Sequence, residues 1–294
     1  MKDLPVLFIF DLDCTLIGDG TPLDDYMELV SFIKSGVSSK KIAVTNQKLP
    51  TPKQIANSIP HEYYRPGLEE AFTKIKAMFP TAEFFIYSAG TKPYVEYNVK
   101  YLEKRFGVTF NRPIFSRDTC IIDETNRYKK SIKSVYPRIF KALQRKYPAL
   151  KYQSNQNNVE TNRTIYIDDN DVVWDKTANN NKWIKCPEYT YMPVFDYRQY
   201  ISKEILTHPL VIEDMKTKNV GFPEILHVDE SERDLMYHAY MANQNSYALR
   251  INIDALKDTF FQQFVKTLQK YKVHMLKNPF SNKQLDKIRS ALSK

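Results

Sequence analysis

Two acidic residues, Asp11 and Asp13, directly follow the first apolar run of the chain, Val6–Phe10. Side chains of an extended strand alternate between its two sides, so residues separated by one neighbour leave the strand on the same side. Two carboxylates held close together repel unless a cation lies between them, and Mg²⁺ suits that position because it prefers oxygen ligands, including those of phosphate. A carboxylate can attack phosphorus, and a second acid can protonate the leaving oxygen and later activate water. The pair therefore indicates Mg²⁺-dependent phosphoryl-transfer chemistry.

A hydroxyl follows the second apolar run. Ser88 comes directly after Glu83–Tyr87, and Ala89, Gly90 and Thr91 lead from it into a helical pattern. A hydroxyl and free backbone N–H groups before a helix can hold a phosphate oxygen. Taken alone, Ser88 is better explained as the N-cap of that helix.

A second acidic pair, Asp168 and Asp169, ends the third apolar run, Thr164–Ile167, and offers further oxygen ligands to the same cation. Between the second and third runs lies a basic pair, Lys129 and Lys130, which can offset the charge of a nucleophilic carboxylate and a phosphoryl group. Each piece alone could be a solvated turn or a helix cap. The ordered combination is far more specific, because each strand end supplies one part of a phosphoryl-transfer site.

The elements that position these residues alternate between apolar runs and helical patterns. Such alternation predicts crossover units and a parallel sheet, whose ligands bind at the carboxyl ends of the strands. The expected fold class is α/β, with a central parallel sheet flanked by helices. The expected strands are Val6–Phe10, Glu83–Tyr87, Pro113–Phe115, Thr164–Ile167 and Lys182–Cys186, and the expected helices are Pro66–Met78, Lys92–Arg105 and Ser131–Tyr147.

The remaining segments are polar or helical. Residues 36–64 and 151–163 look like polar insertions and are predicted to be loops or small excursions. The character changes after about residue 195, so we predict a phosphatase domain over 1–194 and a mainly helical region of unknown role over 195–294. In that region we expect three helices, with a possible short strand at 246–252. The helical patterns are Glu230–Asn243, Asp254–Tyr271 and Asn282–Ser293.

Composition excludes several classes of protein. The 294 residues are 43% hydrophobic and 26% charged, which is ordinary for a globular protein. The sequence has no glycine-rich nucleotide loop, and three widely spaced cysteines fit neither a disulfide framework nor a zinc site. No apolar stretch approaches a membrane span. We therefore expect a cytosolic or nuclear protein without a membrane partner.

The formal net charge is +9, which favours anionic partners. Part of the excess lies at the C-terminus, where several lysines and one arginine face a single acid, Asp286. This basic segment is either a solvated helix face or a surface that attracts phosphate or nucleic acid. Its cationic residues are Lys266, Lys270, Lys272, Lys277, Lys283, Lys287, Arg289 and Lys294.

The four motifs, in this order, resemble those of the haloacid-dehalogenase (HAD) superfamily. The sequence is most similar to the branch of NLI-interacting-factor-like (FCP/SCP-like) phosphatases that act on the RNA polymerase II carboxy-terminal domain. The resemblance covers roughly residues 5–190 and implies a Rossmann-like fold without a large cap, leaving an open cleft for a phosphorylated peptide. Its carrying phrases are FDLDCTLI, YYRPGLEEAF, FFIYSAGTKPYVEYNV, IFSRDTC, RYKKSIKSV and TIYIDDNDVVWD.

The resemblance also implies roles for the site residues. Asp11 would be the phosphorylated nucleophile, and Asp13 the acid/base residue that also offers Mg²⁺ its backbone carbonyl. Ser88 would bind phosphate together with Ala89. Lys130 would be the motif lysine that contacts phosphate, and Asp168 would be its partner. Asp169 would bind Mg²⁺ together with Asp11 and Asp13.

Some alternatives stay open. Lys129 competes with Lys130 for the lysine role. The phrase KIAVTNQ, with Thr45, resembles the second motif of HAD 3′-phosphatases that repair nucleic-acid ends, and under that reading Thr45 replaces Ser88. The leading function is a phosphoserine/phosphothreonine protein phosphatase, with a polymerase II tail as one substrate to consider. The others are a nucleic-acid 3′-phosphatase and a catalytically silent phosphopeptide-binding module.

Overall fold

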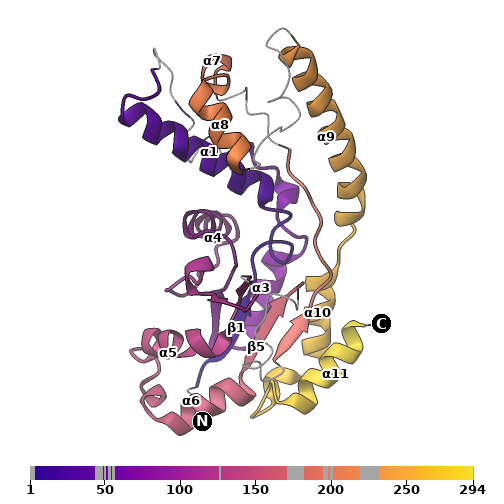
Figure 1. The fold of residues 1–294 in the computed structure, drawn as a ribbon. Coiled ribbons are helices and arrows are strands. Elements are labelled where there is room, and N and C mark those ends of the chain that lie inside the picture. The colour runs from indigo at the N-terminus through magenta and orange to yellow at the C-terminus, as the bar shows by residue number, and fades with distance from the viewer. Residues whose placement is uncertain are drawn as a thin grey trace. The chain divides into compact units, whose positions relative to one another are not determined.

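The computed structural model describes residues 4–43, 49, 51, 54, 57–125, 127–170, 182–194, 198, 201–218 and 232–293. The chain forms two compact units, both discontinuous in sequence (Figure 1). The first comprises Met1–Ile17, Tyr64–Tyr189 and Asp258–Lys294, and the second comprises Gly18–Tyr63 and Thr190–Lys257. The predicted domain division after residue 194 stays a prediction.

A four-stranded parallel sheet forms the centre of the first unit. Its order is β2-β1-β5-β6, with β1 at Val6–Phe10, β2 at Ala82–Ile86, β5 at Thr164–Asp168 and β6 at Trp183–Lys185. Every residue of β1, β2 and β5 is buried, as expected of central strands covered on both faces. The predicted parallel sheet and four of its predicted strands are therefore confirmed.

Side chains of β1 alternate between two helical layers. Leu7 and Ile9 belong to a buried cluster with α5, Ile132–Leu143. On the opposite face, Phe10 packs against Phe72 of α3 and Phe261 of α10, with ring centroids 5.7 and 6.4 Å apart. The helices of this unit are α3 (Leu68–Met78), α4 (Lys92–Phe106), α5, α6 (Gln153–Asn162), α10 (Phe260–Lys270) and α11 (Asn282–Leu292). Residues near the end of the chain thus complete the layer that covers the sheet.

The described residues of the second unit are helical wherever they are regular. Its longer helices are α1 (Thr21–Ser38), α8 (Pro209–Lys218) and α9 (Arg233–Ala255), and α1 packs against α8. The sequence analysis did not predict α1, whereas the mainly helical character after residue 195 is confirmed. None of the described helices is long and apolar enough to cross a membrane. The short elements of the chain are η1 (His61–Tyr63), η2 (Arg117–Thr119), β3 (Ile121–Ile122), β4 (Tyr128–Lys129), η3 (Pro148–Lys151), α7 (Lys203–Leu206) and η6 (Val273–Met275).

Three local predictions are wrong. The predicted loop at 151–163 contains α6, a helix with a single buried side chain, Val159, and therefore no apolar periodicity to detect. The possible strand at 246–252 lies inside α9. The predicted strand Pro113–Phe115 contributes only one bridge, from Phe115 to Tyr87, and the proline there has no N–H to give a ladder.

Glu83 is a buried acid on β2 that accepts three hydrogen bonds. The donors are Lys146 Nζ at 2.5 Å, Tyr147 OH at 2.5 Å and Asn111 Nδ2 at 3.0 Å. Burial alone would raise the pKa of Glu83, but these donors outweigh it and hold that pKa below its usual value. The ionised carboxylate therefore stabilises the fold above the pKa of the unfolded chain. This stabilisation is lost as the pH falls through the folded-state pKa.

We expect Glu83→Gln to lower the free energy of unfolding at neutral pH by about 1–3 kcal/mol, because the charged acceptor of a buried hydrogen-bond group is lost. The variant should also lose less stability than the wild type on acidification. Urea denaturation at a series of pH values measures both effects. Glu70→Gln is the control, since Glu70 pairs with Lys74 at the surface and such pairs contribute little. Identical pH dependence in Glu83→Gln and the wild type would contradict this account.

Candidate active site

Three carboxylates converge at the carboxyl ends of β1 and β5, which are adjacent parallel strands. Asp11 follows β1, and its backbone N–H donates to the Ile167 carbonyl at 2.9 Å. Asp168 ends β5 and Asp169 follows it. Carboxylate oxygens of Asp11, Asp168 and Asp169 all lie within 4.8 Å of one another. The pairing of the two strands thus brings together acids that are far apart in the sequence.

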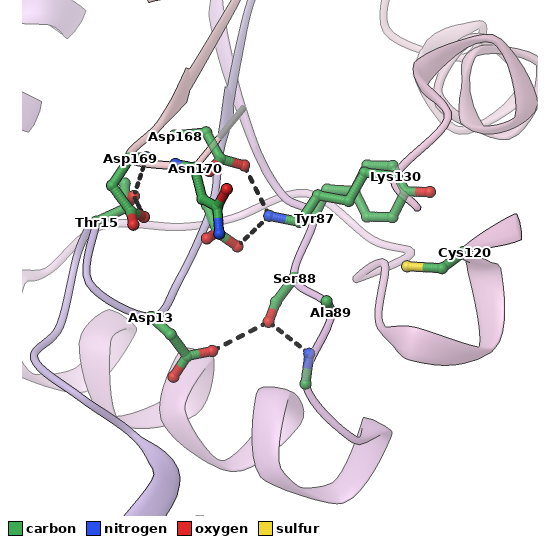
Figure 2. Close-up of polar contacts among 12 residues, drawn as sticks. Asp13, Thr15, Tyr87, Ser88, Ala89, Cys120, Lys130, Asp168, Asp169 and Asn170 are labelled. Carbon is green, nitrogen blue, oxygen red and sulfur yellow. Dashed lines mark hydrogen bonds and ion pairs between the residues drawn. The ribbon is translucent and has the colours of Figure 1, made fainter. Parts of the chain in front are cut away.

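Lys130 lies between two of these acids. Its Nζ is 2.5 Å from Oδ1 of Asp11 and 2.7 Å from Oδ2 of Asp168, and its side chain is only 1% exposed (Figure 2). Burial alone would lower the pKa of Lys130, but the two carboxylates outweigh it and raise that pKa above its usual value. Lys130 is therefore a fixed positive charge at the centre of the acidic cluster.

Lys129 has a different environment. It is the last residue of β4, and its Nζ lies 3.7 Å from Oδ2 of Asp123. Adjacent residues of an extended chain point to opposite sides, so only one of the two lysines can enter the cluster. The geometry places Lys130 there.

The acids of the cluster are costly to ionise together. Burial, followed by repulsion from Asp168, raises the pKa of Asp11 well above its usual value, although Lys130 opposes the shift. The same two causes raise the pKa of Asp169. A buried cluster with three carboxylates and one ammonium group retains an excess of negative charge, which a bound cation would relieve.

This donor set fits a hard divalent cation. Three carboxylates converge on one place, and every donor is an oxygen, which is what Mg²⁺ prefers. The converging side chains are those of Asp11, Asp168 and Asp169, whereas the sequence analysis named Asp11, Asp13 and Asp169. The carboxylate of Asp13 points elsewhere, and its predicted contribution through a backbone carbonyl stays a prediction.

Asp13 and Ser88 form the second part of the site (Figure 2). The Ser88 hydroxyl donates to Oδ2 of Asp13 at 3.3 Å and accepts from the Gly90 N–H at 2.9 Å. The Tyr94 hydroxyl, from the first turn of α4, donates to Oδ1 of Asp13. Ala89 lies between Ser88 and Gly90, in the turn that enters α4. Asp13 is thereby held by two hydroxyl groups, apart from Lys130.

Thr15 connects the turn after β1 to the end of β5. Its hydroxyl donates to Oδ1 of Asp169 at 2.9 Å and accepts from the Asp169 N–H at 3.1 Å. The sequence analysis assigned no role to Thr15 or to Tyr94. For Thr15, the available signal was a threonine two residues after an acidic pair. For Tyr94, the signal was its position in the first turn of a helix that begins beside the site.

Four of the predicted site residues form one cluster. Asp11, Lys130, Asp168 and Asp169 lie together as predicted from the strand ends. Thr45, the rival of Ser88 from the phrase KIAVTNQ, lies outside the described residues. The roles of all these residues in catalysis stay proposals.

The sequence was compared with models of protein families. The model described as NLI interacting factor-like phosphatase matches residues 6–206, more than half of the chain. The chain belongs to this family. The matched segment contains every site residue named above, and the predictions of this branch and of a phosphatase are confirmed at the level of the family.

Solved structures similar to this member of the family are distant. Two match it with 20% identity and a TM-score of 0.41 over 92% of this chain: a variant of fission yeast RNA polymerase II CTD phosphatase Fcp1 bound to beryllium fluoride, and Fcp1 described as an essential RNA polymerase II CTD phosphatase. The chain spans 62% of the length of each Fcp1 chain. A phospho-aspartyl intermediate analogue of phosphoserine phosphatase matches with 14% identity and a TM-score of 0.28, over 56% of this chain and 78% of that one. No curated protein matches the sequence.

Arg65 lies in the matched segment of this NLI interacting factor-like phosphatase and fixes the turn after Asp13. Its side chain is fully buried. Two guanidinium N–H groups donate to the two carboxylate oxygens of Asp258, at 2.9 and 2.7 Å. Others donate to the backbone carbonyls of Thr15, at 3.2 Å, and Pro187, at 2.8 Å. Asp258 thus ties the last part of the chain to the turn that carries the site.

We expect Arg65→Met to lower the free energy of unfolding by about 3–5 kcal/mol, because it leaves Asp258 and two carbonyl groups without their charged donor. Adding Asp258→Asn should cost less than the sum of the two single changes, since both remove the same ion pair. Chemical denaturation of the four proteins completes the cycle. Arg105→Met, which removes an exposed arginine from α4, is the control. Strict additivity would contradict the pairing.

Proposed function

We propose that this protein is a Mg²⁺-dependent phosphoserine/phosphothreonine protein phosphatase that works through an aspartyl phosphate on Asp11. The observation that supports this most is the position of Lys130, in contact with both Asp11 and Asp168 beside Asp169. A buried group of one lysine and three acids stabilises a fold no better than well-packed apolar residues in all of those positions would. It does serve a reaction in which a phosphoryl group arrives at the first acid.

The residues divide the proposed reaction between them. The Asp11 carboxylate attacks phosphorus, and the P–O bond to the serine or threonine oxygen breaks as Asp13 gives that oxygen a proton. Asp13, now ionised, takes a proton from water, which cleaves the aspartyl phosphate and regenerates Asp11. Ser88 and Tyr94 hold the Asp13 carboxyl in place by their hydrogen bonds. Lys130 stabilises negative charge on the phosphoryl oxygens.

The metal is part of the proposal. Asp11 and Asp169 would hold Mg²⁺, with Asp168 beside them, and the ion would supply positive charge to the phosphoryl oxygens. Thr15 orients Asp169 through the two hydrogen bonds between these residues. The proposed substrate is a phosphorylated protein segment, supported by the phrases shared with the CTD phosphatase branch and by the net charge of +9. Fcp1 is described as acting on the RNA polymerase II CTD, and we include that phosphorylated tail among the substrates to test.

A substrate screen tests this function. Phosphate release is measured from phosphoserine and phosphothreonine peptides, including repeats of the polymerase tail, from 3′-phosphorylated oligonucleotides and from an aryl phosphate. We expect release from peptides that requires Mg²⁺ and stops with EDTA. Release from the aryl phosphate but from no peptide would end the protein-substrate part of the proposal. Preference for the oligonucleotide, lost in Thr45→Ala and kept in Ser88→Ala, would favour the 3′-phosphatase instead.

A further inference from the structure

The helix α9 carries an uncharged stripe along one face. The stripe consists of seven residues whose spacing alternates between four and three, and it continues one residue past the helix end. It spans about 32 Å at 1.5 Å per residue. All seven residues are exposed, and the stripe contains only leucine, isoleucine, alanine and serine. Its members are Leu235, Ala239, Ala242, Ser246, Leu249, Ile253 and Leu256.

The buried residues of α9 lie on a different face from the stripe. Tyr237, Ala248 and Ala255 are buried. Each of them lies two positions after a residue of the stripe. Two positions correspond to about 200° around a helix, so Tyr237 faces away from Leu235. A helix that is apolar on two faces normally has both faces covered. Only one face of α9 is covered in the described part of the chain.

The exposure of the stripe is large for aliphatic side chains. Leu235 is 74% exposed, Leu249 65%, Ile253 52% and Leu256 48%. Single exposed apolar residues are ordinary, but a contiguous row of them marks an interaction surface. The alternating spacing of four and three is the pattern by which one helix packs along another in a coiled coil. The surface therefore fits a second helix of similar length.

The order of large and small residues along the stripe selects the partner. After Leu235, the stripe has three small residues, Ala239, Ala242 and Ser246, followed by three large ones, Leu249, Ile253 and Leu256. We propose that a second copy of this chain packs antiparallel along the stripe, with two-fold symmetry.

The antiparallel arrangement matches each small residue with a large one. Ala239 then meets Leu256 of the second copy, Ala242 meets Ile253, and Ser246 meets Leu249. In a parallel pair each residue would meet itself, which leaves gaps where the small residues face one another and crowds the large ones. A two-fold interface uses the same patch on both copies, and the six stripe residues from Ala239 to Leu256 are complementary to their own reverse, with Leu235 beyond the paired segment.

The assembly state of the full chain tests the proposal. Sedimentation equilibrium should give twice the chain mass of 34.6 kDa for the wild type. Leu249→Glu should weaken association roughly tenfold or more, because two unpaired carboxylates would be buried at the seam. Tyr247→Glu is the matched control, since Tyr247 lies on α9 outside the stripe and is 50% exposed. Far-UV circular dichroism and turnover of an aryl phosphate should be unchanged in both variants, which separates lost association from lost folding.

Cross-linking tests the orientation. Ala239→Cys and Leu256→Cys proteins, mixed and oxidised, should form a disulfide between the two different chains, whereas each protein alone should not. The wild-type protein, oxidised in the same way, is the control for disulfides that form through its own Cys14 and Cys120. A wild-type chain that stays monomeric at its highest soluble concentration overturns the proposal. So does a dimer unaffected by Leu249→Glu, or one in which Ala239→Cys links to itself.

Discussion

Asp11→Asn is expected to reduce turnover of every phosphate ester by roughly 10⁴-fold or more, as the loss of a nucleophile does in enzymes that form a covalent intermediate. Asparagine keeps the size of the side chain and its place beside Lys130 but cannot form an acyl phosphate. Initial rates with an aryl phosphate and with the best phosphopeptide, each at saturating Mg²⁺, measure the effect. The aryl phosphate matters because its good leaving group makes turnover independent of how a peptide docks.

Loss of folding must not explain that result. Burial and the neighbouring Asp168 raise the pKa of Asp11, so the ionised carboxylate is harder to keep in the metal-free fold than in the unfolded chain. This difference lowers stability as the pH rises above the ordinary pKa of an aspartate, and a neutral asparagine removes it. Asp11→Asn should therefore be at least as stable as the wild type in EDTA. Thermal unfolding of both proteins at neutral pH checks this point.

Hydrolysis of the aspartyl phosphate distinguishes the proposed role of Asp13 from that of Asp11. If Asp13 activates the hydrolytic water, Asp13→Asn should slow breakdown of the aspartyl phosphate, and acid-quenched protein should carry more label from a ³²P substrate than the wild type does. Asp11→Asn should carry none. Wild-type rates in Asp11→Asn, or label on that variant, would mean that another residue is the nucleophile. The family membership would stand, but the proposed mechanism would fail.

The convergence of the acids was predictable from sequence because it depends on strand ends alone. Asp11 and Asp168 each follow a continuous apolar run, and buried runs joined by helices form parallel strands whose carboxyl ends meet. The two faces of the sheet were predictable in the same way. The helix α6 was harder to predict from the sequence. It has one buried residue, Val159, so its sequence carries no apolar periodicity that could indicate a helix.

Contacts between distant segments could not be predicted from local pattern. Arg65 and Asp258 are separated by 193 positions, and nothing near either residue identifies its partner. Thr15 and Asp169 are separated by 154, and their contact follows only once β1 and β5 are paired. The choice between Lys129 and Lys130 is different. It depends on the residue at which β4 ends, and a shift of one position would exchange the two side chains.

Lys130→Met should therefore be the second most damaging single change, and Lys129→Met its matched control. Removing the ammonium group leaves Asp11 and Asp168 buried without their shared cation, which should lower the free energy of unfolding by about 3–5 kcal/mol in EDTA. Turnover should fall by roughly 10²–10³-fold, as when one preorganised donor to a transition-state oxygen is removed. Lys129→Met removes an ion pair of 3.7 Å with Asp123 near the surface, outside the acidic cluster, and should change both quantities little.

Mg²⁺ distinguishes a charge effect from a packing effect in the Lys130→Met protein. A divalent cation bound at the acids replaces part of the missing positive charge, so Mg²⁺ should raise the melting temperature of this variant more than that of the wild type. Methionine at position 130 fills nearly the same volume, so a packing defect would not respond to the ion. Differential scanning calorimetry across a Mg²⁺ series measures the difference. Damage by Lys129→Met with a normal Lys130→Met protein would reverse the assignment, because the cluster would then draw its charge from the other lysine.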